Sequence, residues 1–252
     1  MKIFVTDKYR IITFLMICAL IGTAAFCAKN YDSRETAAEV RKIPIYSVSR
    51  DDNQIAVTFD CAWGADDIDS IIQTLKKHNC PSTFFVVGTW AEKYPEAAKK
   101  LAEAGHEIGN HSYNHTYYTE LSENEIIDDL NKCNEAVKNA CGFTPVLFRA
   151  PAGEYNNTVV SVSEKLAMPC IQWDADSLDW KGLDGAQMTA RLLPKVKSGS
   201  ILLFHNDTAH TAEALDGILT ALHEKGFTFS TVGKLIYKNN YIVDPTGLQI
   251  KR

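Results

Sequence analysis

Apolar residues recur along most of the chain in two alternating patterns. Short runs rich in branched and aromatic residues, typical of buried strands, occupy 55–59, 82–87, 106–110, 146–150, 170–175, 200–206 and 227–232. Between most of them lie stretches with helical spacing of apolar residues, at 66–77, 91–104, 122–140, 184–197 and 212–225, with a further helix after residue 150. Strands that alternate with helices indicate βαβ units and a parallel sheet. With about seven units and no glycine-rich dinucleotide fingerprint, the pattern predicts an α/β fold, a distorted (β/α) barrel of parallel strands.

The N-terminus differs from this pattern. Lys2, Lys8 and Arg10 precede a charge-free apolar run at 11–28. That length is long for a signal-peptide core, at about 7–15 residues. It lies near the lower limit for a spanning helix, at about 17–25 residues. We therefore expect 1–28 to be a signal peptide or a signal-anchor membrane segment, with a buried core helix as the alternative. Either of the first two would export the rest of the chain.

The remaining boundaries follow from polarity. Residues 29–52 are polar and weakly periodic, which predicts a spacer. The rhythm of strands and helices fills 53–240, the predicted domain, and 241–252 is left as a C-terminal tail. The 26 Lys and Arg against 31 Asp and Glu give a net charge of -5, which argues against a nucleic-acid partner. No feature indicates an obligate protein partner.

Ionisable residues gather where the predicted strands end. They include Asp60, the pair His111 and His115, Arg149, Asp179 and His205. Carboxyl ends of parallel strands meet at one rim, so these side chains should surround one cavity. Two histidines four residues apart can bind one metal ion. Taken singly, each could instead be a solvated turn, a helix cap or a surface turn.

The order of these stretches resembles the polysaccharide deacetylases of the NodB-homology type, carbohydrate esterase family 4. The five matches are Thr58-Phe59-Asp60-Cys61 for TFDDG; His111, Ser112 and His115 for H-S/T-x-x-H; Arg149, Pro151 and Gly153 for R-x-P-x-G; Asp176, Asp179 and Trp180 for D-x-x-D-W; and Leu203 and His205 for L-x-H. The N-terminal segment together with TFDxxWG is most similar to the sporulation-type branch. The resemblance covers about residues 53–235.

This resemblance implies an enzyme that removes N-acetyl groups from glycan with a divalent metal ion. The implied roles are Asp60 as general base, His205 as general acid, Arg149 and Asp179 as their partners, His111 and His115 as metal ligands, and Trp180, Leu203, Pro151 and Trp63 as substrate-binding residues. Peptidoglycan in the cell wall or spore envelope is the expected substrate, with chitin-type oligomers as an alternative. An O-acetyl esterase using the same site is a further alternative.

Cys61 departs from the family pattern, because the family places its third metal ligand, an aspartate, at this position. Three outcomes are open. The thiolate could complete a Cys-His-His set, which would favour zinc over cobalt or another divalent ion. The side chain could point into the core and leave a weak site. Or metal binding could be lost, which would make the protein a non-catalytic glycan-binding protein of the envelope.

Overall fold

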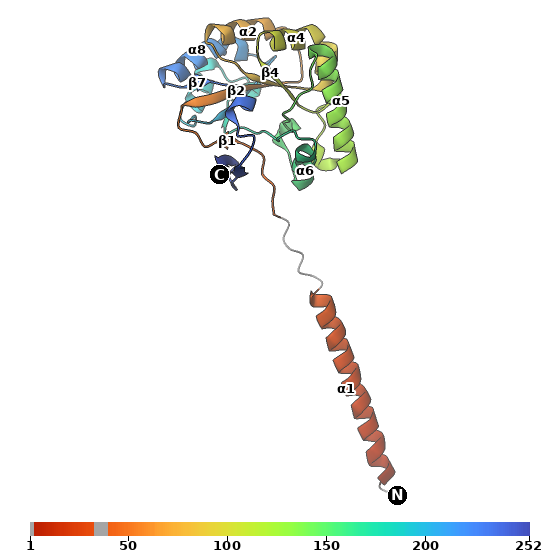
Figure 1. The fold of residues 1–252 in the computed structure, drawn as a ribbon. Coiled ribbons are helices and arrows are strands. Elements are labelled where there is room, and N and C mark those ends of the chain that lie inside the picture. The colour runs from red at the N-terminus through yellow and green to blue at the C-terminus, as the bar shows by residue number, and fades with distance from the viewer. Residues whose placement is uncertain (1–2, 33–39) are drawn as a thin grey trace. The chain divides into compact units, whose positions relative to one another are not determined.

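The structure is a computed structural model that describes residues 3–32 and 40–252 (Figure 1). The chain divides into two compact units, Met1–Arg41 and Lys42–Arg252. In the first unit the described residues form one helix, α1 (Ile3–Asp32). No helix among residues 3–32 and 40–252 has both the length and the apolar character needed to cross a membrane. The signal or anchor role of 1–28 stays a prediction.

The second unit is built around a parallel sheet. The described strands are β1 (Ser47–Val48), β2 (Gln54–Cys61), β3 (Thr83–Val86), β4 (Glu107–Asn110), β5 (Ala175–Asp176), β6 (Ile201–His205), β7 (Thr228–Phe229), β8 (Tyr241–Val243) and β9 (Leu248–Lys251). A six-stranded sheet has the order β4-β3-β2-β6-β5, and β7 also pairs with β2. Isolated parallel bridges continue it from Asn110 to Phe148 and from Phe148 to Cys170. The predicted barrel of parallel strands is thereby confirmed.

Helices surround this sheet, as Figure 1 shows for α2, α4, α5 and α8. Their bounds are α2 (Ile68–Lys77), α3 (Gly88–Lys93), α4 (Pro95–Glu103), α5 (Glu123–Cys141), α6 (Asn157–Lys165), α7 (Gly185–Leu192), α8 (Thr211–Glu224) and α9 (Val232–Leu235). The predicted helix at 91–104 is two helices, because Pro95 has no N–H to continue α3 and instead begins α4. The capping box expected for α5 is present between Ser122 and Glu125.

Three predicted strands are shorter than expected, and one of them, the run at 227–232, forms only β7 (Thr228–Phe229). The run at 146–150 pairs only at Phe148. The run at 170–175 pairs at Cys170 and Ile171 before β5 begins at Ala175. Apolar composition alone therefore overestimates how far the ladder extends where the barrel closes.

A second, smaller sheet corrects two predicted boundaries. It has the order β1-β9-β8, with Ser47 opposite Leu248 and Val48 opposite Gln249. The predicted spacer 29–52 therefore overlaps the folded domain from Lys42 onward, and the predicted tail 241–252 is a hairpin. Residues 33–39 of that spacer lie outside the described residues. These strands were missed because they are only a few residues long and pair far apart in sequence.

Alternation along β2 decides which side chains reach the site. Val57, Phe59 and Cys61 belong to the apolar cluster that includes buried residues of α2 and α8. Phe59 stacks there on Phe84 of β3. Asp60 lies on the opposite face, because successive strand residues point to opposite sides of a sheet. The strand thus places a carboxylate toward the barrel mouth and a thiol toward the surrounding helices.

Candidate active site

A cavity of about 740 Å³ opens at the carboxyl ends of the strands. It is lined by eight of the residues expected at the site: Asp60, Trp63, His111, His115, Asp179, Trp180, Leu203 and His205. Asp60 of β2 lies directly opposite His205 of β6 in the sheet register. The motifs that are far apart in the sequence therefore converge on one rim.

Arg149 holds Asp60 from beneath the cavity. Its side chain is fully buried and donates to Asp60 Oδ1 over 2.8 Å. The same nitrogen donates to Thr58 Oγ1, and another donates to the carbonyl of Gln172. Burial on its own would raise the pKa of Asp60, but the Arg149 cation, helped by protonated His205, outweighs it and holds that pKa below its usual range. Asp60 is therefore ionised at neutral pH.

His111 follows β4 and presents one nitrogen to the cavity side. Its Nδ1 lies 2.9 Å from the carbonyl oxygen of Arg149. Because a carbonyl only accepts, Nδ1 carries the proton and Nε2 keeps its lone pair. Nε2 lies 3.5 Å from Asp60 Oδ2. Burial lowers the pKa of His111 to about 4, so the ring is neutral.

His115 joins His111 through a turn in which Ser112 and His115 both adopt left-handed backbone angles, φ 68° and 58°. The Ser112 hydroxyl accepts from the His115 N–H over 2.8 Å. The two imidazole centroids lie 5.1 Å apart, edge to face. Burial lowers the pKa of His115 as well, which keeps this second imidazole available as a ligand.

The donor atoms of His111 and Asp60 that face each other fit a metal ion. A neutral imidazole nitrogen and an ionised carboxylate oxygen face each other at 3.5 Å, an arrangement that a cation would stabilise. In the described part of the chain, however, no three His, Cys, Asp or Glu side chains are grouped to hold one ion. His111 and His115 are the two imidazoles of the cavity that would hold such an ion.

Cys61 does not complete the set, and the expectation of a thiolate ligand is contradicted by its position. Its side chain is fully buried in the apolar cluster around Phe59. Burial there, together with the nearby charge of Asp60, raises the pKa of the thiol well above its ordinary value, so it stays protonated. Of the three outcomes left open by the sequence, this geometry favours the core position.

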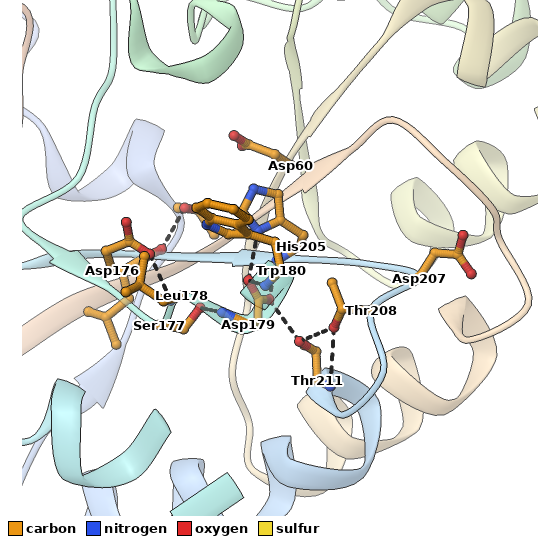
Figure 2. Close-up of polar contacts among 12 residues, drawn as sticks. Asp60, Asp176, Ser177, Leu178, Asp179, Trp180, His205, Asp207, Thr208 and Thr211 are labelled. Atoms are coloured by element: carbon orange, nitrogen blue, oxygen red, sulfur yellow. Dashed lines mark hydrogen bonds and ion pairs between the residues drawn. The ribbon is translucent and has the colours of Figure 1, made fainter. Parts of the chain in front are cut away.

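Asp179 holds His205 on the other side of the cavity (Figure 2). Asp179 is 1% exposed, and its Oδ1 lies 2.8 Å from His205 Nδ1. Burial alone would lower the pKa of His205, but the bond to Asp179 and the charges of Asp60 and Asp179 raise it above its usual value. His205 is thereby kept in its protonated form to higher pH.

Three further bonds fix the Asp179 carboxylate. Its Oδ2 accepts from the His205 N–H over 2.6 Å and from Thr211 Oγ1 over 2.7 Å, while Oδ1 accepts from the Trp180 N–H. Thr208 Oγ1 in turn lies 2.6 Å from Thr211 Oγ1. The sequence analysis missed Thr211, because a threonine at the start of a helix gives no signal of a partner 32 positions earlier.

Aromatic rings flank the opening. Trp63 is 49% exposed and lies 5.8 Å from the His205 ring, and Trp180 is 55% exposed. Tyr117, at 46% exposed, also lines the cavity and was not predicted. Pro151 corrects one expectation, because it is buried and does not line the cavity. Its neighbour Ala152 does, in a left-handed conformation with φ 53°.

The model of the protein family described as "Polysaccharide deacetylase" matches residues 47–171. The uncharacterized protein YlxY of Bacillus subtilis is 34% identical over 77% of this chain and 60% of its own length. The peptidoglycan-N-acetylglucosamine deacetylase PgdA of Listeria monocytogenes is 34% identical over 77% of this chain and 41% of its own. The chain thus spans about half the length of these relatives. A peptidoglycan-N-acetylglucosamine deacetylase of Bacillus cereus is 31% identical over 77% of this chain and 93% of its own.

Solved structures give the same family. BA3943 from Bacillus anthracis, described as a CE4 family pseudoenzyme, has a TM-score of 0.73 and 34% identity, covering 76% of this chain and 68% of its own. A BA3943 mutant described as having restored enzymatic activity matches with the same TM-score and 35% identity, covering 76% of this chain and 70% of its own. With the parallel barrel, the five motifs and these matches together, the chain belongs to the polysaccharide deacetylases of carbohydrate esterase family 4.

Proposed function

We propose that this protein removes N-acetyl groups from cell-wall glycan, with peptidoglycan as its substrate. The observation that carries the proposal is the opposition of two proton carriers across β2 and β6. Asp60 is held ionised by Arg149, and His205 is held protonated by Asp179, at paired positions in one cavity. Amide hydrolysis needs such a base and such an acid.

The family's deacetylases depend on a metal ion, which when held here by His111 and His115 would activate water and polarise the amide carbonyl. Asp60 accepts the proton that water releases as its oxygen bonds to the acetyl carbon. His205 donates its proton to the nitrogen as the carbon–nitrogen bond breaks, so that acetate and an amine leave. Leu203, 2% exposed, lines the cavity and would contact the acetyl methyl, and the indoles of Trp63 and Trp180 would pack on the sugar.

Zinc is the metal that we propose, with cobalt or another divalent ion as an outcome of metal analysis. Two neutral imidazoles are ligands that zinc accepts readily, and zinc tolerates an open position for water. The substrate proposal is supported by the names of relatives that act on N-acetylglucosamine or N-acetylmuramic acid in peptidoglycan.

We further propose that the protein acts outside the cytoplasm, tethered to the membrane or secreted to the wall or spore envelope. The support is the charge-free run at 11–28 behind Lys2, Lys8 and Arg10. Protease protection of the full chain in intact cells tests this. Digestion only after lysis would contradict export.

A second candidate function is glycan binding without hydrolysis. It is favoured by the burial of Cys61 where the family has a ligand, and by the likeness to a protein described as a pseudoenzyme. The two functions differ in whether acetate is released, not in whether glycan binds.

Acetate release and metal content test the proposal together. We expect the full chain to release acetate from N-acetylglucosamine oligomers and peptidoglycan when zinc or cobalt is added, and less from acetylxylan. His111→Ala should abolish metal binding and release. His78→Ala is the matched control, because its Nε2 contacts Asp216 outside the cavity. No acetate from any substrate with any metal would instead favour the binding protein.

A further inference from the structure

The wall of the cavity carries an imbalance of charge. Among the described residues that line it are Asp60, Asp176, Asp179 and Asp207, but no lysine or arginine. Asp60 and Asp179 are paired with Arg149 and His205. In the described part of the chain, Asp176 and Asp207 form no ion pair. The charge of Asp176 helps to raise the pKa of His205, but neither carboxylate has an ion-pair partner of its own among the described residues.

Both carboxylates are held in place by the backbone. Asp176 Oδ1 accepts from the Leu178 N–H over 2.8 Å. Asp207 Oδ2 accepts from the Gly64 N–H over 2.7 Å. A Cβ at Gly64 would lie 2.6 Å from that oxygen, so only glycine allows this approach. The second oxygen of each carboxylate accepts no hydrogen bond within the described residues, which leaves each carboxylate one oriented acceptor for a ligand.

The two carboxylates flank the general acid. Figure 2 shows Asp176 to one side of His205 and Asp207 to the other. The exposed indole of Trp180 stands on the loop that carries Asp176, and the exposed indole of Trp63 precedes Gly64, whose N–H donates to Asp207. A glycan strand whose reacting sugar lies at His205 would therefore pass its neighbouring sugars close to these acceptors.

Two further cations lie near this rim, and neither forms an ion pair with the carboxylates. Lys181 Nζ lies 4.9 Å from the ring centroid of Trp180 and forms no ion pair with the carboxylates. Arg191 contacts Asp176 only through the backbone carbonyl, to which its Nε donates. The second oxygen of each carboxylate is thus available to a ligand.

We propose that Asp176 and Asp207 are binding subsites for the ammonium groups of sugars that have already lost their acetyl group. The inference rests on the proposed deacetylation, whose product is an amine. A protonated amine next to the reacting sugar would form a charge-assisted hydrogen bond to either carboxylate. A partly deacetylated strand should therefore bind more tightly than a fully acetylated one.

The proposal is tested by comparing the binding of two probes, one uncharged and one cationic. Calorimetry on the full chain would compare the fully acetylated pentamer of N-acetylglucosamine with the glucosamine pentamer, at mildly acidic pH. We expect the amine form to bind more tightly, and each of Asp176→Asn and Asp207→Asn to weaken that form by about 2- to 5-fold, as for one exposed ion pair. Added salt should reduce the difference.

Two controls show whether a loss of affinity comes from the charge of Asp176 and Asp207 or from a general effect of the substitution. Asp66→Asn, an exposed neighbour that does not line the cavity, should change neither affinity. At alkaline pH, where the sugar amine is neutral, the preference should disappear while the carboxylates stay ionised. Equal affinities of wild type for the two pentamers, or an equal loss for both in the Asp variants, would overturn the subsites.

Acetate release, measured on the same preparation, keeps the two proposals apart. Release of acetate without a preference for amines would remove the subsites and leave the deacetylase. A preference for amines without any release would retain the subsites on a glycan-binding protein.

Discussion

Both sides of the cavity pair a buried carboxylate with a cationic side chain, but the two pairs have opposite effects on protonation. On the β2 side, the buried carboxylate of Asp60 contacts Arg149 at 2.8 Å, and on the β6 side the buried carboxylate of Asp179 contacts His205 at the same distance. Arginine holds its proton at every pH of interest, so its pairing fixes the charge of Asp60. Histidine does not, so its pairing moves the proton equilibrium of His205.

The two carboxylates also differ in what remains free. Both oxygens of Asp179 are engaged in hydrogen bonds, four in all: two with His205, one with Trp180 and one with Thr211. Asp60 Oδ1 accepts a hydrogen bond from Arg149, whereas its Oδ2 faces His111 without a hydrogen bond. A carboxylate with a spare oxygen can accept a proton from water, whereas a saturated one can only support its partner. Two features therefore distinguish the base, Asp60, from the supporting carboxylate, Asp179. They are the intrinsic pKa of the cationic partner and the number of carboxylate oxygens without a hydrogen bond.

Asp60→Asn breaks the β2 side and should have the largest effect. Activity should fall about 10²–10⁴-fold, the usual contribution of a positioned base, while glycan binding persists. Steady-state rates with calorimetric binding on the same sample check this. Asp69→Asn, whose carboxylate pairs with Lys100 at the surface, is the control. Retained activity in folded Asp60→Asn protein would show that another group is the base.

Asp179→Asn breaks the β6 side and should shift the pH profile. Because Asp179 raises the pKa of His205, wild-type activity should be lost as pH rises through that raised value. The variant should lose activity at lower pH and have a lower maximal rate.

The stability of the same variant follows the same sign. The contribution of the protonated His205–Asp179 pair is complete below the unfolded histidine pKa of about 6.5 and is lost as pH rises through the folded value. The loss of thermal stability in Asp179→Asn should therefore be largest in mild acid. An unmoved basic limb in the variant would contradict the role of His205 as acid.

Thr211→Val should sharpen the comparison with a smaller shift of the same sign. It removes one of the four contacts to Asp179 and keeps the shape of the side chain. A less stabilised carboxylate raises the pKa of His205 less, so the basic limb should move toward that of Asp179→Asn without reaching it. Thr211→Ser, which keeps the hydroxyl, should restore the wild-type profile. A loss of stability with an unchanged profile in Thr211→Val would limit this residue to packing.

Cys61→Ala should have the smallest effect on activity. Because the thiol lies in the apolar cluster, the variant should keep its metal content and rate and lose about 1 kcal/mol of stability from the small cavity. Metal analysis and thermal unfolding on one preparation measure both. Loss of the bound ion in a folded variant would restore Cys61 as a ligand.

The sequence predicted much of this site because its chemistry lies at strand ends. Asp60 and His205 each follow an apolar run, and parallel strands bring such ends to one rim. The position of Cys61 was left open because both faces of β2 are buried, so composition did not reveal which face each residue takes. Tyr117 and Thr211 could not be found, since their roles depend on contacts between distant segments.

The fold shows the same limit. Long periodic helices such as α5 were predicted nearly to their ends, where a capping box and Gly142 with φ 83° mark them. The pairing of β1 with β9 was not, because it joins residues 47–48 to residues 248–249 without a local signal. Local chemistry predicts where elements begin and end, and long-range pairing has to be observed.

That pairing gives the domain a mechanical property. A pulling force applied to the chain before Lys42 would first meet the bonds of Ile45 with Cys170 and Gln172. It would then meet those from Tyr46 to Gly247 and from Ser49 to Gln249, before it reached β2. Val48 is also held by the carbonyl of Gly199, just before β6. Force would load the backbone bonds between the two ends of the domain, which share it along β1 and β9. Tension on the N-terminal side would therefore be borne first by bonds that join distant segments, before it reached the strand that carries Asp60.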